Sequence, residues 1–436
     1  MDNLENIENN DESVEQTPVA ASAAQSKATD GVGKTRKPIR VSLGVLIACI
    51  LLTGILVFQA TFVALTQQHK RDLNEAYGQA AEFDKMLEVA ELYKKYYMYD
   101  IDPDAMRENM ARAYALFSGD KYTSYYTAAE YLEAVSSSAG NSVGIGVYVV
   151  MSATDNMIEV VHVMANSPAE VAGVQKGDVI TAIGGVKVSD VGYEAAVDLV
   201  RGEKGSVVTL EVTRDGSKLT IDVVRGDYTA ETVLSEMIEV DGKKIGYIRI
   251  TEFMQVTVTQ FKNAVRSLMN EGAEGFIFDV RNNPGGELSA ICNILDFLLQ
   301  EGPIVHIIGA ASEREVYTSD ASEIDLPMVV LANGSTASAA ELFTSALKDY
   351  EKAQVIGTLT YGKGCGQEGF YLSDGSVLYI TSFFYNPPFS DNYDGIGITP
   401  DIEIEMPEEL QNTNLFLVAH DVDVQLQQAI KVLISQ

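Results

Sequence analysis

The chain has 436 residues, of which 62 are acidic and 31 basic, so its formal net charge is −31. This length accommodates two or three domains with cores of their own, and an acidic excess of this size argues against a nucleic-acid partner because it repels a phosphate backbone. The three cysteines form no disulfide framework and no CxxC metal pattern; a disulfide between Cys292 and Cys365 and two unpaired thiols are the alternatives.

The first 65 residues predict a tail and a membrane anchor. Residues 1–33 have almost no large apolar side chains and a basic cluster follows them, so we expect a disordered tail over residues 1–40. Residues 41–65 carry no charge and are long enough for a helix that crosses a bilayer. Basic residues are denser before this segment than after it, so the positive-inside rule places the tail in the cytoplasm and everything after residue 66 outside. These basic residues are Lys34, Arg36, Lys37 and Arg40 before the segment, and Lys70 and Arg71 after it.

Other interpretations of residues 41–65 stay open. A cleaved signal peptide usually has a shorter apolar region and a small-residue cleavage site, and no clear site follows here. Leu46-Ile47-Ala48-Cys49 is similar to a lipoprotein signal, but the residues after Cys49 remain apolar where a lipoprotein turns polar. A buried core helix is disfavoured by the length of the uncharged run. An uncleaved signal-anchor is therefore the expectation.

Residues 66–138 predict a helical lead-in segment. Apolar residues recur every three or four positions from Leu73 to Leu92, and no proline occurs before Pro103. A further helix is expected over residues 103–117, with Asp102 as its N-terminal cap. The tyrosines at positions 93, 96, 97 and 99 are interpreted as helix packing rather than as a binding stripe.

From residue 139 to residue 226 the pattern changes to short β-branched strands, two helices at residues 167–173 and 193–200, and a closing hairpin around Asp215-Gly216. In order, the segment contains Gly144-Ile145-Gly146-Val147, Ser167-Pro168-Ala169, Ala172-Gly173-Val174, Gly177-Asp178-Val179-Ile180 and Arg201-Gly202. It resembles a PDZ domain of bacterial proteases, which implies a mixed β-sandwich with two helices. Backbone N–H groups of the glycine-flanked loop would hold the terminal carboxylate of a peptide, and the candidate residues are Gly144, Ile145, Gly146 and Val147.

Residues 227–436 alternate apolar strands with amphipathic helices, which predicts an α/β domain. The strands are expected at residues 244–250, 275–280, 328–332 and 354–357. The helices are expected at residues 256–270, 288–299 and 339–349.

Three features of this domain point to acyl transfer. Ser338 follows an apolar strand and precedes the helix that begins at Ala339, where free N–H groups and the helix dipole stabilise an oxyanion. Gly285 and Gly286 end another strand with a turn, which presents a second backbone donor. Lys363 lies between two glycines, and burial of its amine lowers the lysine pKa, so that a neutral amine is able to take the serine proton.

Histidine does not supply the base. Only His306 belongs to the predicted strands and helices of the α/β core, on an apolar strand where a core histidine is expected. His69 flanks the predicted membrane anchor, His162 lies in the PDZ-like segment and His420 lies near the end of the chain. No G-x-S-x-G elbow occurs in residues 227–436, and no H-E-x-x-H helix occurs in the chain. A Ser–Lys pair is therefore the economical interpretation, and we expect no metal and no cofactor.

This constellation resembles the carboxyl-terminal processing peptidases over residues 66–405. In that family a glutamate, a lysine and a glutamine follow the nucleophile at the spacing of Glu341, Lys363 and Gln367 after Ser338. The resemblance implies that Ser338 is the nucleophile, that Lys363 is the general base and that Gln367 orients its amine. The oxyanion donors would be the N–H of Ala339 and one from Gly285 or Gly286.

The resemblance has further implications. Arg201 is a candidate sensor of bound peptide, and two copies are expected to pair through the helical segment. The chain departs from the family pattern at Ala340, where a serine is usual, and at Cys365-Gly366, where Thr-Val is usual. Neither departure removes a catalytic group, and Cys365 is interpreted as a small buried filler. Ser335 and Thr336 are interpreted as turn or cap residues.

The expected protein is a serine endopeptidase anchored in the cytoplasmic membrane by one helix, with its catalytic part outside. Its partners would be protein or peptide substrates with free C-termini. Two alternatives stay open: a membrane-tethered PDZ adaptor with an inactive peptidase fold, and a lysine-assisted esterase or amidase that acts on cell-wall material.

Overall fold

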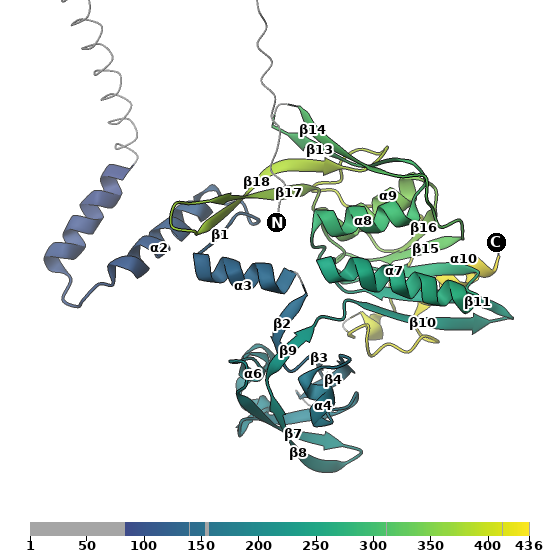
Figure 1. Cartoon of the computed structure of the whole chain (residues 1–436), viewed down its shortest axis with the longest axis horizontal. Coiled ribbons are helices and arrows are strands. Elements are labelled where there is room, and N and C mark those ends of the chain that lie inside the picture. Colours follow the sequence, from purple (N-terminus) through teal and green to yellow (C-terminus); the bar gives the residue numbers. More distant parts are fainter. Residues whose placement is uncertain (1–82, 139, 153–156, 311, 412, 436) are drawn as a thin grey trace, which may run out of the picture. The chain divides into compact units, whose positions relative to one another are not determined.

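A computed structural model of the chain describes residues 83–138, 140–152, 157–310, 312–411 and 413–435 (Figure 1). The chain divides into two compact units, residues 1–100 and 101–436. In the first unit, residues 83–96 are helical, as the apolar spacing predicts. The predicted tail and the predicted anchor at residues 41–65 lie outside the described residues. Among the helices that are described, none has both the length and the apolar character to span a bilayer.

The second unit contains a six-stranded sheet in the order β10-β11-β12-β15-β16-β19. Strands β10 and β11 are antiparallel, and all pairs from β11 to β19 are parallel. This arrangement confirms the predicted α/β core. The strands are Val233–Val240 (β10), Lys243–Ile250 (β11), Gly275–Asp279 (β12), Met328–Ala332 (β15), Ala353–Gly357 (β16) and Ile402–Glu403 (β19).

Helices cover both faces of this sheet (Figure 1). Side chains alternate between the faces along a strand, so Phe276 and Phe278 pack in one apolar cluster while Ile277 packs in the other. Because both faces are buried, β12 is apolar at nearly every position. The first cluster contains residues of Gln255–Asn270 (α7), Leu288–Leu298 (α8) and Ala339–Asp349 (α9), and the second contains residues of Val424–Ile434 (α10).

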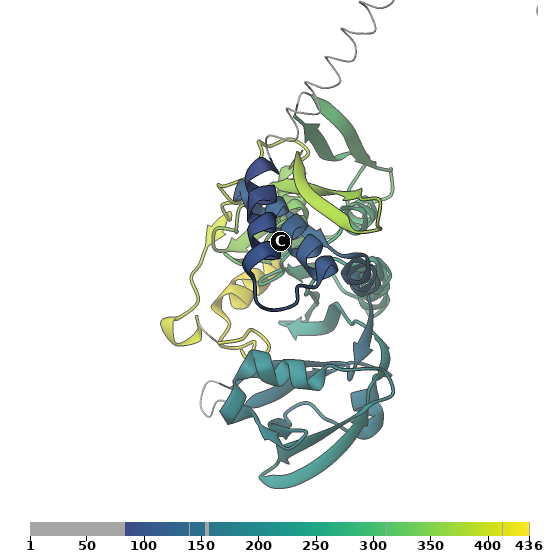
Figure 2. The ribbon, with the colours of Figure 1, turned by 90° about the vertical axis from the view of Figure 1, so that its left-hand side faces the viewer.

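A second, antiparallel sheet has the order β1-β18-β13-β14, with β17 also paired to β18. Its strand β1 belongs to the lead-in segment and pairs Ser124 with Tyr379 of β18. Figures 1 and 2 both show lead-in elements beside β17 and β18. The strands are Ser124–Tyr126 (β1), Gly302–Gly309 (β13), Glu313–Ser319 (β14), Cys365–Tyr371 (β17) and Val377–Asn386 (β18).

The lead-in segment of this unit is mainly helical, as predicted. Helix α2 (Pro103–Ala115) begins after Asp102, whose carboxylate accepts hydrogen bonds from the amides of Asp104 and Ala105. A 3-10 turn, η1 (Leu116–Ser118), follows it, and helix α3 (Ala128–Ser138) follows β1. Strand β1 itself was not predicted, because three residues show too little alternation.

The segment predicted as a PDZ domain has one antiparallel sheet in the order β3-β4-β5-β7-β8, with β6 on β5. The expected mixed β-sandwich is therefore wrong. The strands pair one after another into a single continuous sheet, and this sheet covers the apolar core. Strands β2 and β9 pair separately and form the two-stranded connection to the rest of the unit. The limits at residues 139 and 226 stay predictions. The elements are Asn141–Gly144 (β2), Val147–Met151 (β3), Ile158–Val163 (β4), Pro168–Ala172 (α4), Val179–Ile183 (β5), Val186–Lys187 (β6), Val188–Val191 (α5), Tyr193–Val200 (α6), Val207–Arg214 (β7), Ser217–Val224 (β8) and Gly226–Thr229 (β9).

Strand β3 also contacts the α/β core. The Tyr148 ring stacks on Phe416 with ring centroids 5.7 Å apart, and the Tyr148 hydroxyl donates to the carbonyl of Glu231 at 3.0 Å. On the neighbouring strand, His162 Nε2 lies 2.7 Å from the Glu231 carboxylate. Side chains of β3 and β4 therefore connect the PDZ sheet to the α/β core.

Candidate active site

Ser338 lies at the junction of β15 and α9, as the sequence predicts. Its backbone has φ 57° and ψ −123°, a conformation that costs about 1–3 kcal/mol and persists only where the surroundings enforce it. Two hydrogen bonds enforce it here. The Ser338 amide donates to Glu341 Oε2 at 2.9 Å, and the Ala337 amide donates to the carbonyl of Asn283 at 3.0 Å.

The turn after β12 packs directly against the serine. A side chain at Gly285 would lie 2.7 Å from Ser338 Cβ and 2.9 Å from the Ala339 nitrogen, so this close approach requires glycine. The Gly285 amide already donates to Asn283 Oδ1 at 2.8 Å. Within the described residues, the amides of Gly286 and Ala339 have no such acceptor, so the geometry favours Gly286 over Gly285 as the second donor.

Lys363 is half-buried in the loop before β17. Its Nζ donates to Gln367 Oε1 at 3.1 Å and lies 4.3 Å from the centre of the Tyr122 ring. Gln367 Nε2 in turn donates to Thr381 Oγ1 at 3.1 Å. Burial lowers the pKa of the Lys363 amine, which favours the neutral form that a general base requires.

Glu341 connects the serine helix to the lysine loop. Its side chain is fully buried, and Oε2 accepts from the amides of both Ser338 and Lys363, at 2.9 and 2.8 Å. Oε1 accepts from the Gly362 amide and the Thr360 hydroxyl, both at 2.6 Å. One carboxylate therefore fixes both catalytic candidates through their backbones.

Tyr385 of β18 lies between the two candidates. Its hydroxyl is 3.0 Å from Ser338 Oγ and 2.7 Å from the carbonyl oxygen of Lys363. Within the described part of the chain, no hydrogen bond joins Ser338 Oγ to Lys363 Nζ directly. The structure therefore brings Ser338, Lys363 and Gln367 into one site in which a phenol occupies the bridging position.

No sequence pattern predicted Tyr122, Thr381 or Tyr385 as site residues, because the lead-in segment and β18 reach the site through pairing of the second sheet. The sequence analysis also did not predict that Glu341 holds the serine helix and the lysine loop together. The feature that could have indicated this role is the position of Glu341, an acidic residue in the first turn of a helix that is otherwise mainly apolar on its buried side.

Three other residues considered in the sequence analysis have structural rather than catalytic roles. Thr336 is a buried turn residue, since its hydroxyl donates to the carbonyl of Val280 at 2.8 Å. Cys292 and Cys365 are both buried and free, so the disulfide alternative is wrong. Burial raises the pKa of Cys292 to about 12 and that of Cys365 to about 11, which leaves unreactive thiols.

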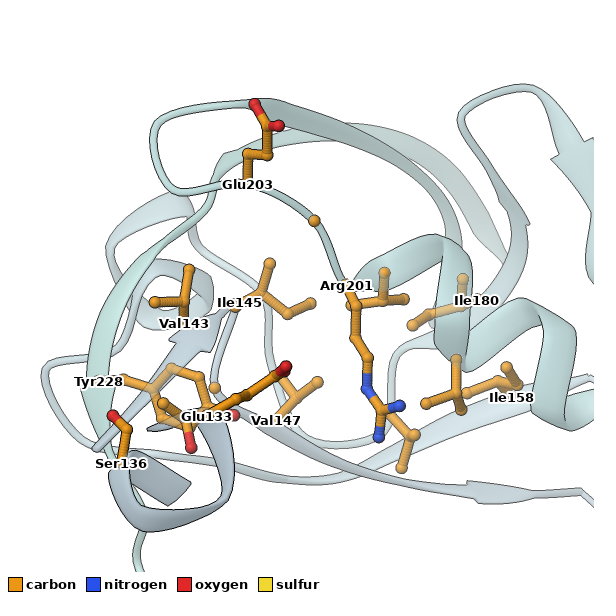
Figure 3. A pocket seen from close by; sticks show the side chains of 17 residues that line it. Glu133, Ser136, Val143, Ile145, Val147, Ile158, Ile180, Arg201, Glu203 and Tyr228 are labelled. Atoms are coloured by element: carbon orange, nitrogen blue, oxygen red, sulfur yellow. The ribbon is translucent and has the colours of Figure 1, made fainter. Parts of the chain in front are cut away.

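A cavity of about 940 Å³ lies along the PDZ segment. The predicted residues Gly144, Ile145, Gly146 and Val147 line it together with Arg201 (Figure 3). Arg201 is an exposed side chain that pairs with Asp198 at 3.2 Å. The acidic Glu133 and the polar Ser136 extend into the same cavity from helix α3.

A smaller cavity, of about 370 Å³, adjoins the catalytic candidates. Its lining includes Gln367 and the Tyr122 ring on which the Lys363 amine rests. The opposite wall includes Tyr131 and Val135 of α3. Helix α3 therefore lines both cavities.

Comparisons with known proteins show which families this chain resembles. Residues 244–404 match the family model described as peptidase family S41, and residues 159–214 match a PDZ domain model. A carboxyl-terminal-processing protease of Picosynechococcus sp. is 32% identical over 72% of this chain and 76% of the relative. A carboxy-terminal-processing protease of Bartonella bacilliformis is 33% identical over 76% of each chain. The solved structure of a putative S41 protease from Bacteroides fragilis is similar in fold, with a TM-score of 0.53 and 18% identity over 79% of this chain and 96% of that chain.

Proposed function

The chain belongs to peptidase family S41 as a carboxyl-terminal processing serine protease with a PDZ domain, and we propose that it cleaves proteins outside the cytoplasmic membrane after its PDZ groove has captured their C-termini. The proposed nucleophile is Ser338 and the proposed general base is Lys363. Gln367 orients the lysine amine, and the amides of Ala339 and Gly286 hold the oxyanion.

One observation carries the catalytic part of this proposal. The backbone amides of a strained serine at a helix N-terminus and of a half-buried lysine both donate to the same carboxylate oxygen, Glu341 Oε2. The inactive-adaptor alternative does not account for a lysine whose pKa is lowered by burial, and family membership also disfavours it.

The reaction follows from the chemistry of these groups. The neutral Lys363 amine takes the proton of the Ser338 hydroxyl while Oγ bonds to the carbonyl carbon of the scissile peptide. The oxyanion that forms accepts hydrogen bonds from the amides of Ala339 and Gly286. On collapse, the Lys363 ammonium gives its proton to the leaving amine, and the peptide C–N bond breaks. Lys363 then takes a proton from water as the water oxygen bonds to the acyl carbon. When this second tetrahedral intermediate collapses, the ester C–O bond breaks and the Lys363 ammonium returns its proton to Ser338 Oγ.

The cavities support capture of a C-terminus. The glycine-flanked loop offers backbone N–H groups to a terminal carboxylate, and the edge of strand β3 is able to pair with the incoming chain. Because α3 lines both this groove and the cavity beside Gln367, a captured chain that follows α3 reaches the catalytic residues. Arg201, at the groove, is the proposed sensor of bound peptide.

Membrane attachment through residues 41–65 is part of the same proposal, supported by the uncharged run and the basic residues that precede it. Extraction of the full chain from membranes only by detergent would support it. Pairing of two copies through the helices of residues 66–134 is a separate expectation, which the mass of the detergent-solubilised chain tests.

The function is tested with a reporter protein that ends in an apolar tail, incubated with the full chain in detergent. We expect cleavage by the wild-type chain and none by S338A or K363A, while both variants still bind the tail. Full activity of either variant would reject the assigned pair. Turnover of a cell-wall fragment without cleavage of any protein would instead favour the esterase or amidase alternative.

A further inference from the structure

The ring of Tyr385 is buried beside Ser338, and its backbone is fixed on both sides. Tyr385 is only 5% exposed. Its backbone amide donates to the carbonyl of Gly364 at 3.1 Å, and Asn392 Nδ2 donates to the backbone carbonyl of Tyr385 at 3.1 Å. The hydroxyl therefore has little freedom to leave the neighbourhood of Ser338.

The hydroxyl of Tyr385 has two neighbours and one hydrogen. The carbonyl oxygen of Lys363, at 2.7 Å, is able only to accept. Ser338 Oγ, at 3.0 Å, also accepts from the phenol. The one phenolic hydrogen is therefore shared between two acceptors, the Lys363 carbonyl and Ser338 Oγ, and the hydrogen of the Ser338 hydroxyl takes no part in this contact.

The balance between the two acceptors changes when the serine loses its hydrogen. Oγ then carries negative charge and is only an acceptor, and a small rotation of the phenolic O–H turns its hydrogen from the Lys363 carbonyl to Oγ. Burial raises the pKa of Tyr385, so the phenol keeps its hydrogen for this purpose. A hydrogen bond to a developing charge is stronger than one to a neutral hydroxyl.

We propose that Tyr385 is a further catalytic residue, whose hydroxyl shares its hydrogen between Ser338 Oγ and the Lys363 carbonyl in the resting enzyme and donates it fully to Oγ as the serine gives its proton to Lys363. The proposal rests on the assignment of Ser338 and Lys363 made above. Because the donated bond is stronger in the transition state than in the ground state, it accelerates the reaction without tightening substrate binding.

The chain contains a matched control for this hydroxyl. Tyr393 is buried like Tyr385, and the two ring centroids are 6.2 Å apart. Among the described residues, its hydroxyl is one of two buried side-chain polar atoms without a hydrogen-bond partner. Substitution of either tyrosine by phenylalanine keeps the ring and removes one buried oxygen, but only Y385F removes a contact with Ser338.

The test compares Y385F, Y393F and S338A in the full chain, with the apolar-tailed reporter as substrate. We expect kcat of Y385F to fall about 10- to 100-fold, the loss of a hydrogen bond to a charged group, with KM within about twofold of wild type. Y393F should retain kcat within about twofold. Thermal unfolding and binding of the reporter tail should match wild type for both.

Each other outcome has a distinct meaning. Wild-type kcat for Y385F together with an inactive S338A overturns the role of Tyr385 and leaves the proposed function intact. Equal losses in Y385F and Y393F, or a loss through KM alone, overturn it as a packing effect. Activity of S338A overturns the proposed function itself. If Y385F does not fold, Y385M and Y393M provide the same comparison, because methionine fills the space without a hydroxyl.

Discussion

The carboxylate of Glu341 accepts a hydrogen bond from the backbone N–H of Lys363 at 2.8 Å, although the two residues lie on different elements of the core. Every other partner of this carboxylate is also a donor: the amides of Ser338 and Gly362 and the hydroxyl of Thr360. An ionised carboxylate is the side chain that satisfies four donors at once, since it only accepts. Glu341 thus holds the spacing between the proposed nucleophile and base.

Replacing Glu341 by glutamine is expected to lower both stability and activity. The amide nitrogen of glutamine would face donors such as the Lys363 amide, and buried donors without an acceptor cost about 1–3 kcal/mol each. We expect the free energy of unfolding to fall by about 2–4 kcal/mol, measured by urea denaturation, and kcat to fall at least tenfold. E323Q, at a partly exposed ion pair with Lys352, is the control and should change stability by less than about 1 kcal/mol. An E341Q chain as active as wild type would show that the spacing does not depend on this carboxylate.

The pH dependence of activity is expected to report the Lys363 amine. A general base must be neutral, so kcat rises with pH through the pKa of Lys363, which burial places below its usual value of 10.5. Asp120 raises this pKa and Lys121 lowers it, while Cys365 and Tyr361 also face the amine. D120N should therefore move the acidic limb of the profile to lower pH, and K121Q should move it to higher pH. Shifts of the same sign in the two variants would contradict the assignment of this limb to Lys363.

Local patterns in the sequence were sufficient for the central strands and the helices α7, α8 and α9 of the α/β core. The bounds of Tyr193–Val200, Met328–Ala332 and Ala339–Asp349 agree with those predicted, because periodicity together with flanking glycines and turns marks such elements without tertiary information. The α/β class follows from their alternation.

The part of the site that could not be predicted depends on long-range pairing. Tyr122 precedes the three-residue strand β1, and β1 joins the site by pairing with β18. Tyr385 acquires its position from the register of β18 with the strand after Lys363, and nothing in its neighbouring residues encodes that register. The site residues that could be predicted lie in local sequence motifs. The residues that surround them reach the site only because distant strands pair in the folded chain.

Peptide capture is expected to depend on Gly146. Its φ is 74°, and an added Cβ would lie 2.4 Å from Ser167 Cβ, so G146A is strained and also displaces the loop that would hold the carboxylate. Gly216 in the β7–β8 turn has a similar φ of 77° but nothing within 4 Å of an added Cβ. Both variants should lose about 1 kcal/mol from the backbone conformation. Only G146A should weaken binding of an apolar C-terminal peptide, by tenfold or more in a fluorescence anisotropy titration. Equal affinity in the two variants would remove this loop from the binding site.

The C-terminal helix is expected to stabilise the strand end that leads to the oxyanion turn. Asp423 caps α10 by accepting from the amide of Leu426, and its carboxylate also receives two hydrogen bonds from the Arg281 guanidinium, at 3.0 and 2.8 Å. Arg281 binds Asp279, the last residue of β12, at 2.6 Å. All three side chains are buried. Removing one partner of a buried ion pair leaves an uncompensated charge, so D423A should reduce the free energy of unfolding by about 3–5 kcal/mol. E239A, which breaks an exposed pair with Lys244, should cost less than about 1 kcal/mol.

The same network predicts how stability depends on acid. Burial alone raises the pKa of Asp279, but Arg281 and Arg249 hold it well below its usual value of 3.8. A carboxyl whose pKa is lower in the folded state stabilises the protein fully above its unfolded pKa, and this contribution is lost as pH falls below 3.8 toward the folded value. We therefore expect urea midpoints of the wild-type chain to fall as the pH decreases below about 4, and D279N to show a lower midpoint at neutral pH with a flatter decline in acid. If D279N declined as steeply as wild type, the acid sensitivity would have to come from other carboxylates, and the buried network would not be its source.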